Sequence, residues 1–252
     1  MNIQLIRHAT LLVHMHSRKI LVDPMLSPAG AMSTVANAAN TLRNPLVNLT
    51  VNVAELLSAD AVLLTHTHRD HFDDVAATLL PKDIPFFCQP ADKAHVEKYG
   101  FTDVRPVETD VSWHDIHITR TGGQHGSGEL ATKMGPVSGY ILAADNDPSL
   151  YIAGDTIWCK DVQDALTLHH PDVTVVFAGS AQFLSGGPIT MDEQGITKLC
   201  RHSPATKVFV AHMEAWSHCL LTRNSLRETL HENGLTSQVV VPVDGEIVNF
   251  LK

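Results

Sequence analysis

Short runs of apolar and β-branched residues lie close together in the first part of the chain. The runs at 2–7, 10–15 and 19–22 are separated by turn-forming residues, a pattern that predicts three strands in a meander. Asp23-Pro24 then interrupts the pattern, because proline has no backbone N–H for a sheet ladder. We therefore expect this part of the chain to form an antiparallel sheet that ends at residue 22.

The segment 25–52 has a different character. It is rich in Ala, Asn, Ser and Pro and has few large apolar residues before Leu46. A segment of this length without helices or strands of its own is uncommon inside a compact domain, and is usually functional or mobile. We expect it to cover part of an active site.

From residue 53 onward, helical and strand patterns alternate. We expect helices at 53–58, 73–80, 91–99, 162–169, 192–200 and 223–233. We expect strands at 61–64, 85–88, 102–107, 115–121, 137–144, 149–153, 173–178, 207–211, 238–241 and 246–250. This order predicts an α/β (α+β) fold in which two sheets pack face to face with helices outside. We expect one domain over 1–252, with two pseudo-symmetric halves at about 1–121 and 122–252.

Composition narrows the class of protein. The chain is 44% hydrophobic and 18% charged, as in ordinary globular proteins, and its net charge of −9 disfavours nucleic acid or an anionic membrane as a partner. No apolar stretch reaches the length of about 18 residues that a membrane helix needs. The four cysteines are far apart and fit reduced thiols in a cytoplasmic protein: Cys88, Cys159, Cys200 and Cys219. A homo-oligomer is compatible with the sequence, which does not fix the oligomeric state.

Potential metal ligands are concentrated in Thr65–His71, directly after a buried-strand pattern. His66 and His68 are two residues apart, so in an extended chain they point the same way and can converge on one ion. Asp70 and His71 follow where the chain turns and can reach a second position. Imidazole and carboxylate together suit Zn²⁺, Mn²⁺ or Fe²⁺. The alternative interpretation is a polar turn that is merely rich in histidine.

Four such side chains do not complete two metal sites, and three further candidates lie at strand ends. His125 stands in a glycine-rich loop, Asp155 ends an apolar strand, and His212 follows Ala211 at the end of another. Strand ends are held rigidly, as a preorganised site requires. Taken singly, Asp155 could be a turn or helix-cap residue and each histidine a hydrogen-bonded surface residue. Their occurrence together in one chain favours the metal-binding interpretation.

The string Thr65–His71 resembles the His-x-His-x-Asp-His signature of the metallo-β-lactamase-fold superfamily. Over its whole length the chain is most similar to the small bacterial branch that includes ascorbate-6-phosphate lactonase. The resemblance implies a four-layer αββα sandwich and two divalent cations, with zinc expected first and manganese or iron as alternatives. It assigns the first ion to His66, His68 and His125, the second to Asp70, His71 and His212, and both to Asp155.

This ligand set predicts a binuclear metal-dependent hydrolase. Two cations about 3.5–4 Å apart can share a water and lower its pKa toward neutrality. We expect Asp70 to orient the resulting hydroxide, Asp155 to bridge both ions, and His218 to transfer a proton or contact substrate. The expected substrate is a small metabolite such as a lactone, ester, thioester or phosphoester. The alternatives are a metallo-nuclease that acts on RNA and a non-catalytic metal-binding sensor.

Other residues carry weaker indications. Trp158, Ser180 and Gln182 follow strands at the expected active-site edge and are candidates for substrate contacts, although each also fits a structural role. His8 and Asp23 lie at strand ends in the first sheet, where each could orient a metal ligand or serve the fold alone.

Overall fold

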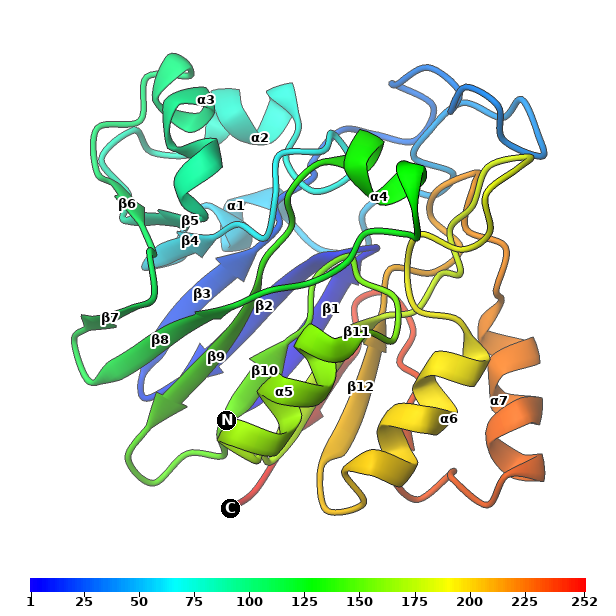
Figure 1. Ribbon diagram of the computed structural model, residues 1–252. Helices are drawn as coiled ribbons and strands as arrows, with labels where there is room; N and C mark the ends of the chain where they lie inside the picture. The colour runs from blue at the N-terminus through cyan, green and yellow to red at the C-terminus, as the bar shows by residue number, and fades with distance from the viewer.

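The first of two seven-stranded sheets contains the beginning of the chain and one strand from near its end (Figure 1). The computed structural model describes all residues, 1–252. In spatial order the strands are β14 (Ile247–Asn249), β1 (Asn2–Arg7), β2 (Thr10–Met15), β3 (Arg18–Val22), β4 (Ala61–Leu63), β5 (Phe86–Cys88) and β6 (Val104–Pro106). The predicted meander is present, since β1, β2 and β3 pair antiparallel, and the pairs from β3 to β6 are parallel.

The second sheet faces the first and is formed by residues 110–240. Its strands are β13 (Val239–Val240), β12 (Lys207–Ala211), β11 (Val173–Phe177), β10 (Leu150–Ile152), β9 (Gly139–Ala144), β8 (Ile116–Thr121) and β7 (Asp110–Trp113). Strand β7 was not predicted, because two of its four residues are exposed polar side chains. The chain thus passes to the second sheet between residues 106 and 110, ahead of the expected division near 121.

Helices cover the outer face of each sheet (Figure 1). They are α1 (Val53–Leu56), α2 (Asp74–Leu79), the short 3₁₀ helix η1 (Pro90–Asp92), α3 (Lys93–Lys98), α5 (Lys160–His169), α6 (Glu193–His202) and α7 (Arg223–Glu232). A further helix, α4 (Glu129–Met134), lies beyond the ends of the strands in Figure 1. Side chains of Asp73, Asp192 and Thr222 cap α2, α6 and α7 by accepting a backbone N–H from the first turn. Helix α4 was not predicted, because it buries no side chain and so has no apolar periodicity.

Three hydrophobic clusters hold the layers together. The largest lies between the sheets and includes Leu63, Phe177 and Phe209. A second joins the second sheet to α5, α6 and α7, and a third joins the first sheet to its helices. Side chains alternate across each strand, so Phe177 faces the other sheet while Val176 faces the helices. The four-layer αββα order predicted from the sequence is confirmed.

The segment 25–52 runs as a loop over one end of the two sheets, in blue at the upper right of Figure 1. Apart from an isolated bridge between Met32 and Asn44 it has no strand pairing. It is tied down by backbone bonds, including Leu46 N to the Ala215 carbonyl at 2.7 Å. No helix in the molecule is long and apolar enough to cross a membrane.

Candidate metal centre

The side chains predicted as metal ligands come together at one edge of the two sheets. The Thr65–His71 segment leaves the end of β4, His125 and Asp155 lie in loops after β8 and β10, and His212 follows β12 directly. His68 is partly exposed, and the other six are buried: His66, Asp70, His71, His125, Asp155 and His212. Strands that end at the same edge therefore carry all seven into one small volume.

These seven side chains form two neighbouring groups. One contains His66, His68 and His125, and the other contains Asp70, His71, Asp155 and His212. Within each group, one potential ligand atom per residue lies within 4.8 Å of the others. Each group has the number and type of atoms that could hold a metal ion.

Asp155 lies between the two groups. Its Oδ2 is 3.2 Å from Nε2 of His71 and 3.5 Å from Nε2 of His125, while its Oδ1 is 3.4 Å from Nε2 of His212. His71 and His212 belong to the same group as Asp155, and His125 belongs to the other. The Asp155 carboxylate is therefore placed to face both positions.

Several of these atoms have no hydrogen-bond partner in the protein. Nε2 of His71, His125 and His212 and Oδ1 of Asp155 are all buried and unpartnered. Leaving a polar atom buried and unsatisfied costs about 1–3 kcal/mol, so folded proteins avoid it. Four such atoms directed at the same volume fit divalent cations as their partners.

The electrostatics of the cluster favour charged carboxylates. Burial acts to raise the pKa of Asp70 and Asp155, but the surrounding histidines lower both well below the usual range. Burial lowers the pKa of His66 well below its ordinary value. Burial also opposes charge on His71 and His212, yet nearby carboxylates raise the pKa of His71 well above its ordinary value and that of His212 to about 10. In the metal-free protein the two carboxylates therefore face protonated His71 and His212, and a cation that binds there must displace these protons.

Three of the histidines are oriented through their other ring nitrogen. Nδ1 of His71 lies 2.8 Å from Oδ2 of Asp23, and Nδ1 of His125 lies 2.7 Å from the Ile189 carbonyl. Nδ1 of His212 lies 3.6 Å from Sγ of Cys219. A metal-bound histidine usually makes such a contact, which fixes its tautomer and ring direction.

A cavity of about 230 Å³ opens onto the centre. One side is polar and contains His68, Asp70, His125 and Asp155, together with His218. The other side is largely apolar and is formed by Val35, Ala36, Met134, Phe183, Ile189 and Trp216. The segment 25–52 contributes two of these residues, as expected for a loop that covers part of the site.

The chain matches the beta-lactamase superfamily domain over residues 18–213. It belongs to this family. The superfamily expected from the Thr65–His71 string is therefore confirmed, and the chain is a metal-dependent hydrolase of the metallo-β-lactamase fold.

Individual relatives within the β-lactamase superfamily are similar over the full length. The UPF0173 protein YddR of Bacillus subtilis is 39% identical, over 99% of this chain and 100% of its own. The crystal structure of an isothiocyanate hydrolase from Delia radicum gut bacteria is 36% identical, with a TM-score of 0.96 over 100% of both chains. A possible metal-dependent hydrolase from Veillonella parvula is 34% identical, with a TM-score of 0.96 over 99% of both.

The candidate substrate contacts lie elsewhere in this β-lactamase-superfamily domain. Trp158 does not line the cavity; it packs against the cluster between the second sheet and its helices, with its ring 5.5 Å from that of His202 on α6. Ser180 and Gln182 do not line the cavity either. Their neighbour Phe183 does, because a strand end locates a loop without fixing which of its side chains turns inward.

His218 lines the cavity, as expected. It is buried, and burial lowers its pKa to about 4, so its imidazole is neutral at pH 7. The sequence analysis missed Phe183 and Trp216, which lie within two residues of Gln182 and His218. Proximity to a residue already selected was the only available signal for them.

Proposed function

We propose that the protein is a binuclear hydrolase of a small, neutral metabolite. The observation that carries this proposal is the position of Asp155 between the two groups, with the unpartnered Nε2 of His125 in one group and those of His71 and His212 in the other. His66, His68 and His125 would hold one cation, Asp70, His71 and His212 the other, and Asp155 both. Bound in this way, a pair of cations supplies a hydroxide at neutral pH by lowering the pKa of a shared water.

The protein's own groups would orient the reacting molecules. Asp70 lines the cavity as a carboxylate, so it can accept a hydrogen bond from the attacking water and hold its direction. His218 presents a neutral imidazole to the same space, and its Nδ1 has no partner in the protein. It is therefore available to contact the substrate, to take up a proton from the attacking water, and only then to pass that proton to the leaving group.

The cavity favours a substrate without a phosphate or carboxylate group. Arg69 is the one Lys or Arg side chain that lines it. Its guanidinium already donates to Ser33 Oγ at 2.8 Å and to the Ser33 and Thr34 carbonyls, and it lies 5.4 Å from the centre of the Trp216 ring. An anionic group of the substrate that lies away from the two cations would lack a free cationic side chain, which favours a neutral lactone, ester or thioester.

An isothiocyanate is a further neutral candidate. The relative from Delia radicum gut bacteria is named for hydrolysis of this class. In that reaction, the oxygen of water would bond to the central carbon of the N=C=S group. The bond between this carbon and the nitrogen would break, and the nitrogen would receive both protons of the water. The products would be an amine and carbonyl sulfide. The apolar wall that contains Phe183 and Trp216 would accommodate the organic substituent.

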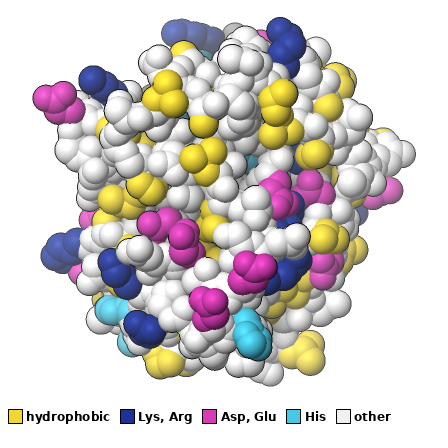
Figure 2. All heavy atoms as spheres, turned by 90° about the vertical axis from the view of Figure 1, so that its right-hand side faces the viewer, with side chains coloured by type: hydrophobic (Ala, Val, Ile, Leu, Met, Phe, Trp, Pro, Cys, Tyr) yellow, Lys and Arg dark blue, Asp and Glu magenta, His cyan; other side chains and the backbone are white.

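The surface does not favour RNA as a substrate. The net charge is −9, and Figure 2 shows acidic side chains interspersed with basic ones on the face that it displays. A nucleic-acid site instead presents a basic patch or stripe. We therefore propose a small-molecule substrate.

The test combines metal analysis with a substrate panel. Purified protein loaded with Zn²⁺, Mn²⁺ or Fe²⁺ is assayed with an aryl isothiocyanate, a lactone, an ester, a thioester, a phosphodiester and an RNA oligonucleotide. We expect the wild type to bind two ions per chain and to turn over a neutral substrate. His68→Ala and Asp155→Ala should lose bound metal and turnover together. His117→Ala is the control, because His117 is exposed on β8.

Each result has a distinct meaning. Unchanged metal content in both ligand variants would contradict the assignment of the centre. Two bound ions with no turnover of any substrate would favour a sensor, and cleavage restricted to RNA would favour a nuclease.

A further inference from the structure

His8 occupies an unusual position for a histidine. It lies in the tight turn between β1 and β2 with a φ of 58°, in the left-handed region, and its side chain is fully buried. His16 has a similar backbone conformation in the next turn, with a φ of 47°, but its side chain is exposed. Left-handed backbone at a non-glycine residue is unfavourable and often marks a functional site. The inward direction of His8 therefore has a cause beyond the turn.

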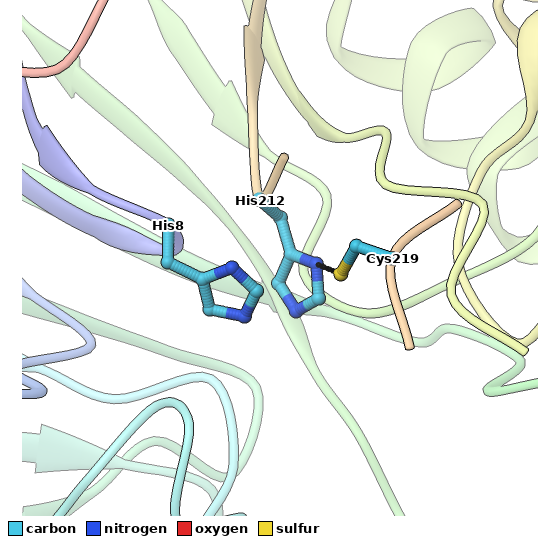
Figure 3. A group of neighbouring side chains, drawn as sticks. All are labelled: His8, His212 and Cys219. Atoms are coloured by element: carbon cyan, nitrogen blue, oxygen red, sulfur yellow. Dashed lines mark hydrogen bonds between the residues drawn. The ribbon is translucent and has the colours of Figure 1, made fainter. Parts of the chain in front are cut away.

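The contacts of His8 are with two residues of the second group. Its Nε2 lies 3.3 Å from Oδ2 of Asp70, and its ring centre lies 3.6 Å from that of His212 (Figure 3). Its backbone carbonyl accepts a hydrogen bond from the His212 N–H at 2.8 Å. His8 thus touches one proposed ligand through its side chain and another through both ring and backbone.

The proton on the His8 ring can be placed from these contacts. Nε2 is the ring nitrogen of His8 that has a polar partner, Oδ2 of Asp70 at 3.3 Å. A carboxylate such as that of Asp70 only accepts hydrogen bonds. The other nitrogen of His8, Nδ1, has no partner. The N–H therefore lies on Nε2 and donates to Asp70.

His212 is held from two directions. The His8 ring lies against one side of it, and Cys219 Sγ lies 3.6 Å from its Nδ1 (Figure 3). These contacts leave its Nε2 directed at Asp155 Oδ1 and at Asp70 Oδ2, at 3.4 and 3.6 Å. Since Oδ2 of Asp70 is also the atom that faces His8, the two ligands share one support.

We propose that His8 is a positioning residue that holds Asp70 and His212 in place for the second cation. The inference rests on the proposed function, because it assigns His8 to one of the two proposed cation positions. It predicts an uneven effect. Loss of the His8 donor should weaken the ion held by Asp70, His71 and His212, and should leave the ion held by His66, His68 and His125 largely unchanged.

The test compares two substitutions of His8. His8→Phe keeps a ring beside His212 and removes the donor, whereas His8→Gln keeps an N–H donor on a flexible side chain. Zn²⁺ is titrated into metal-free protein and followed by calorimetry. In His8→Phe we expect the ion held by His66, His68 and His125 to bind as in the wild type. The ion held by Asp70, His71 and His212 should bind about 10–100-fold more weakly, and His8→Gln should recover part of this loss. His16→Phe is the matched control for an aromatic ring at a left-handed turn position.

A structural role would give a different pattern. Equal weakening of both ions, with a matching fall in the thermal midpoint of the metal-free protein, would overturn the proposal. Normal binding of both ions by His8→Phe, or no recovery in a folded His8→Gln, would also overturn it. Fewer than two ions bound by the wild type would contradict the proposed function instead.

A measurement on metal-free wild-type protein is independent of ion binding and of how the variants fold. With ¹⁵N-labelled histidine, nuclear magnetic resonance distinguishes a ring proton on Nε2 from one on Nδ1. The proposal requires the Nε2–H form of His8. The Nδ1–H form would overturn it.

Discussion

Asp23 offers a sharp test of how the centre is oriented. It is fully buried; its Oδ1 accepts from the Thr65 N–H at 2.7 Å, and its Oδ2 lies 2.7 Å from Thr65 Oγ1 and 2.8 Å from Nδ1 of His71. In Asp23→Asn an amide would replace one oxygen with nearly the same shape. With its NH₂ toward His71, the amide forces the ring proton onto Nε2, the atom that must face the cation. With its NH₂ toward Thr65, it opposes the backbone N–H.

The expected loss is large for metal binding and limited for stability. Second contacts of metal-bound histidines typically contribute about 10–100-fold in affinity, which corresponds to roughly 1.4–2.7 kcal/mol. Burial raises the pKa of Asp23, despite the bonds from His71 and Thr65, so its charge does not stabilise the folded state. Loss of the charge should therefore cost little by itself, but the amide leaves one buried donor without an acceptor, which should lower the free energy of unfolding of metal-free protein by about 1–3 kcal/mol.

The assay is Zn²⁺ titration of the metal-free protein, with urea denaturation in parallel. Asp60→Asn is the control, because the Asp60 carboxylate also accepts a backbone N–H, from Lys19 at 2.8 Å, at a distance from the centre. Binding of both ions by Asp23→Asn with wild-type affinity would refute the proposed orientation of His71. A loss of stability well above about 3 kcal/mol would show instead that Asp23 mainly serves the fold.

Three further predictions concern pH and the loop over the site. Carboxylates raise the pKa of His71, and they raise that of His212 to about 10, so a cation that binds must displace protons from these rings. The apparent affinity for the metal should therefore rise between pH 6 and 9. Calorimetry in two buffers measures the proton release. Because the folded-state pKa of His212 exceeds its ordinary value of 6.5, the thermal midpoint of metal-free protein should fall as the pH rises from about 6.5 toward 10; a flat profile would contradict this. Arg69→Ala removes the side-chain bonds to Ser33 and Thr34 and should raise KM several-fold at unchanged metal content. Arg18→Ala is the control. An unchanged KM in Arg69→Ala would contradict the prediction.

The sequence was sufficient to locate the candidate centre because its residues follow strands. A buried apolar run such as 207–211 predicts a strand, and the residue after it, His212, must lie at the sheet edge. The same reasoning brought together His125 and Asp155 with the 65–71 segment. Elements without an apolar face, β7 and α4, gave no such pattern and were missed.

The cavity wall could not be predicted in this way, because contacts between distant loops set its shape. The Leu184 N–H donates to the Asn37 carbonyl at 2.7 Å and joins the loop after β11 to the segment 25–52. Such a bond depends on the whole fold, and no local pattern encodes it. For this reason the sequence could indicate the loop that contains Ser180 and Gln182 but could not indicate that Phe183 is the side chain that lines the cavity.

The placement of β14 has a consequence for the order of events during synthesis. This strand pairs with β1 through Asn2, Ile3 and Gln4, although about 240 residues separate the two strands along the chain. At about 5–20 residues per second, a ribosome needs roughly 12–50 s to make the intervening chain. For that time the outer edge of β1 has open backbone groups that can pair with another nascent chain. Conditions that slow elongation should therefore increase aggregation of this protein before they affect its finished form.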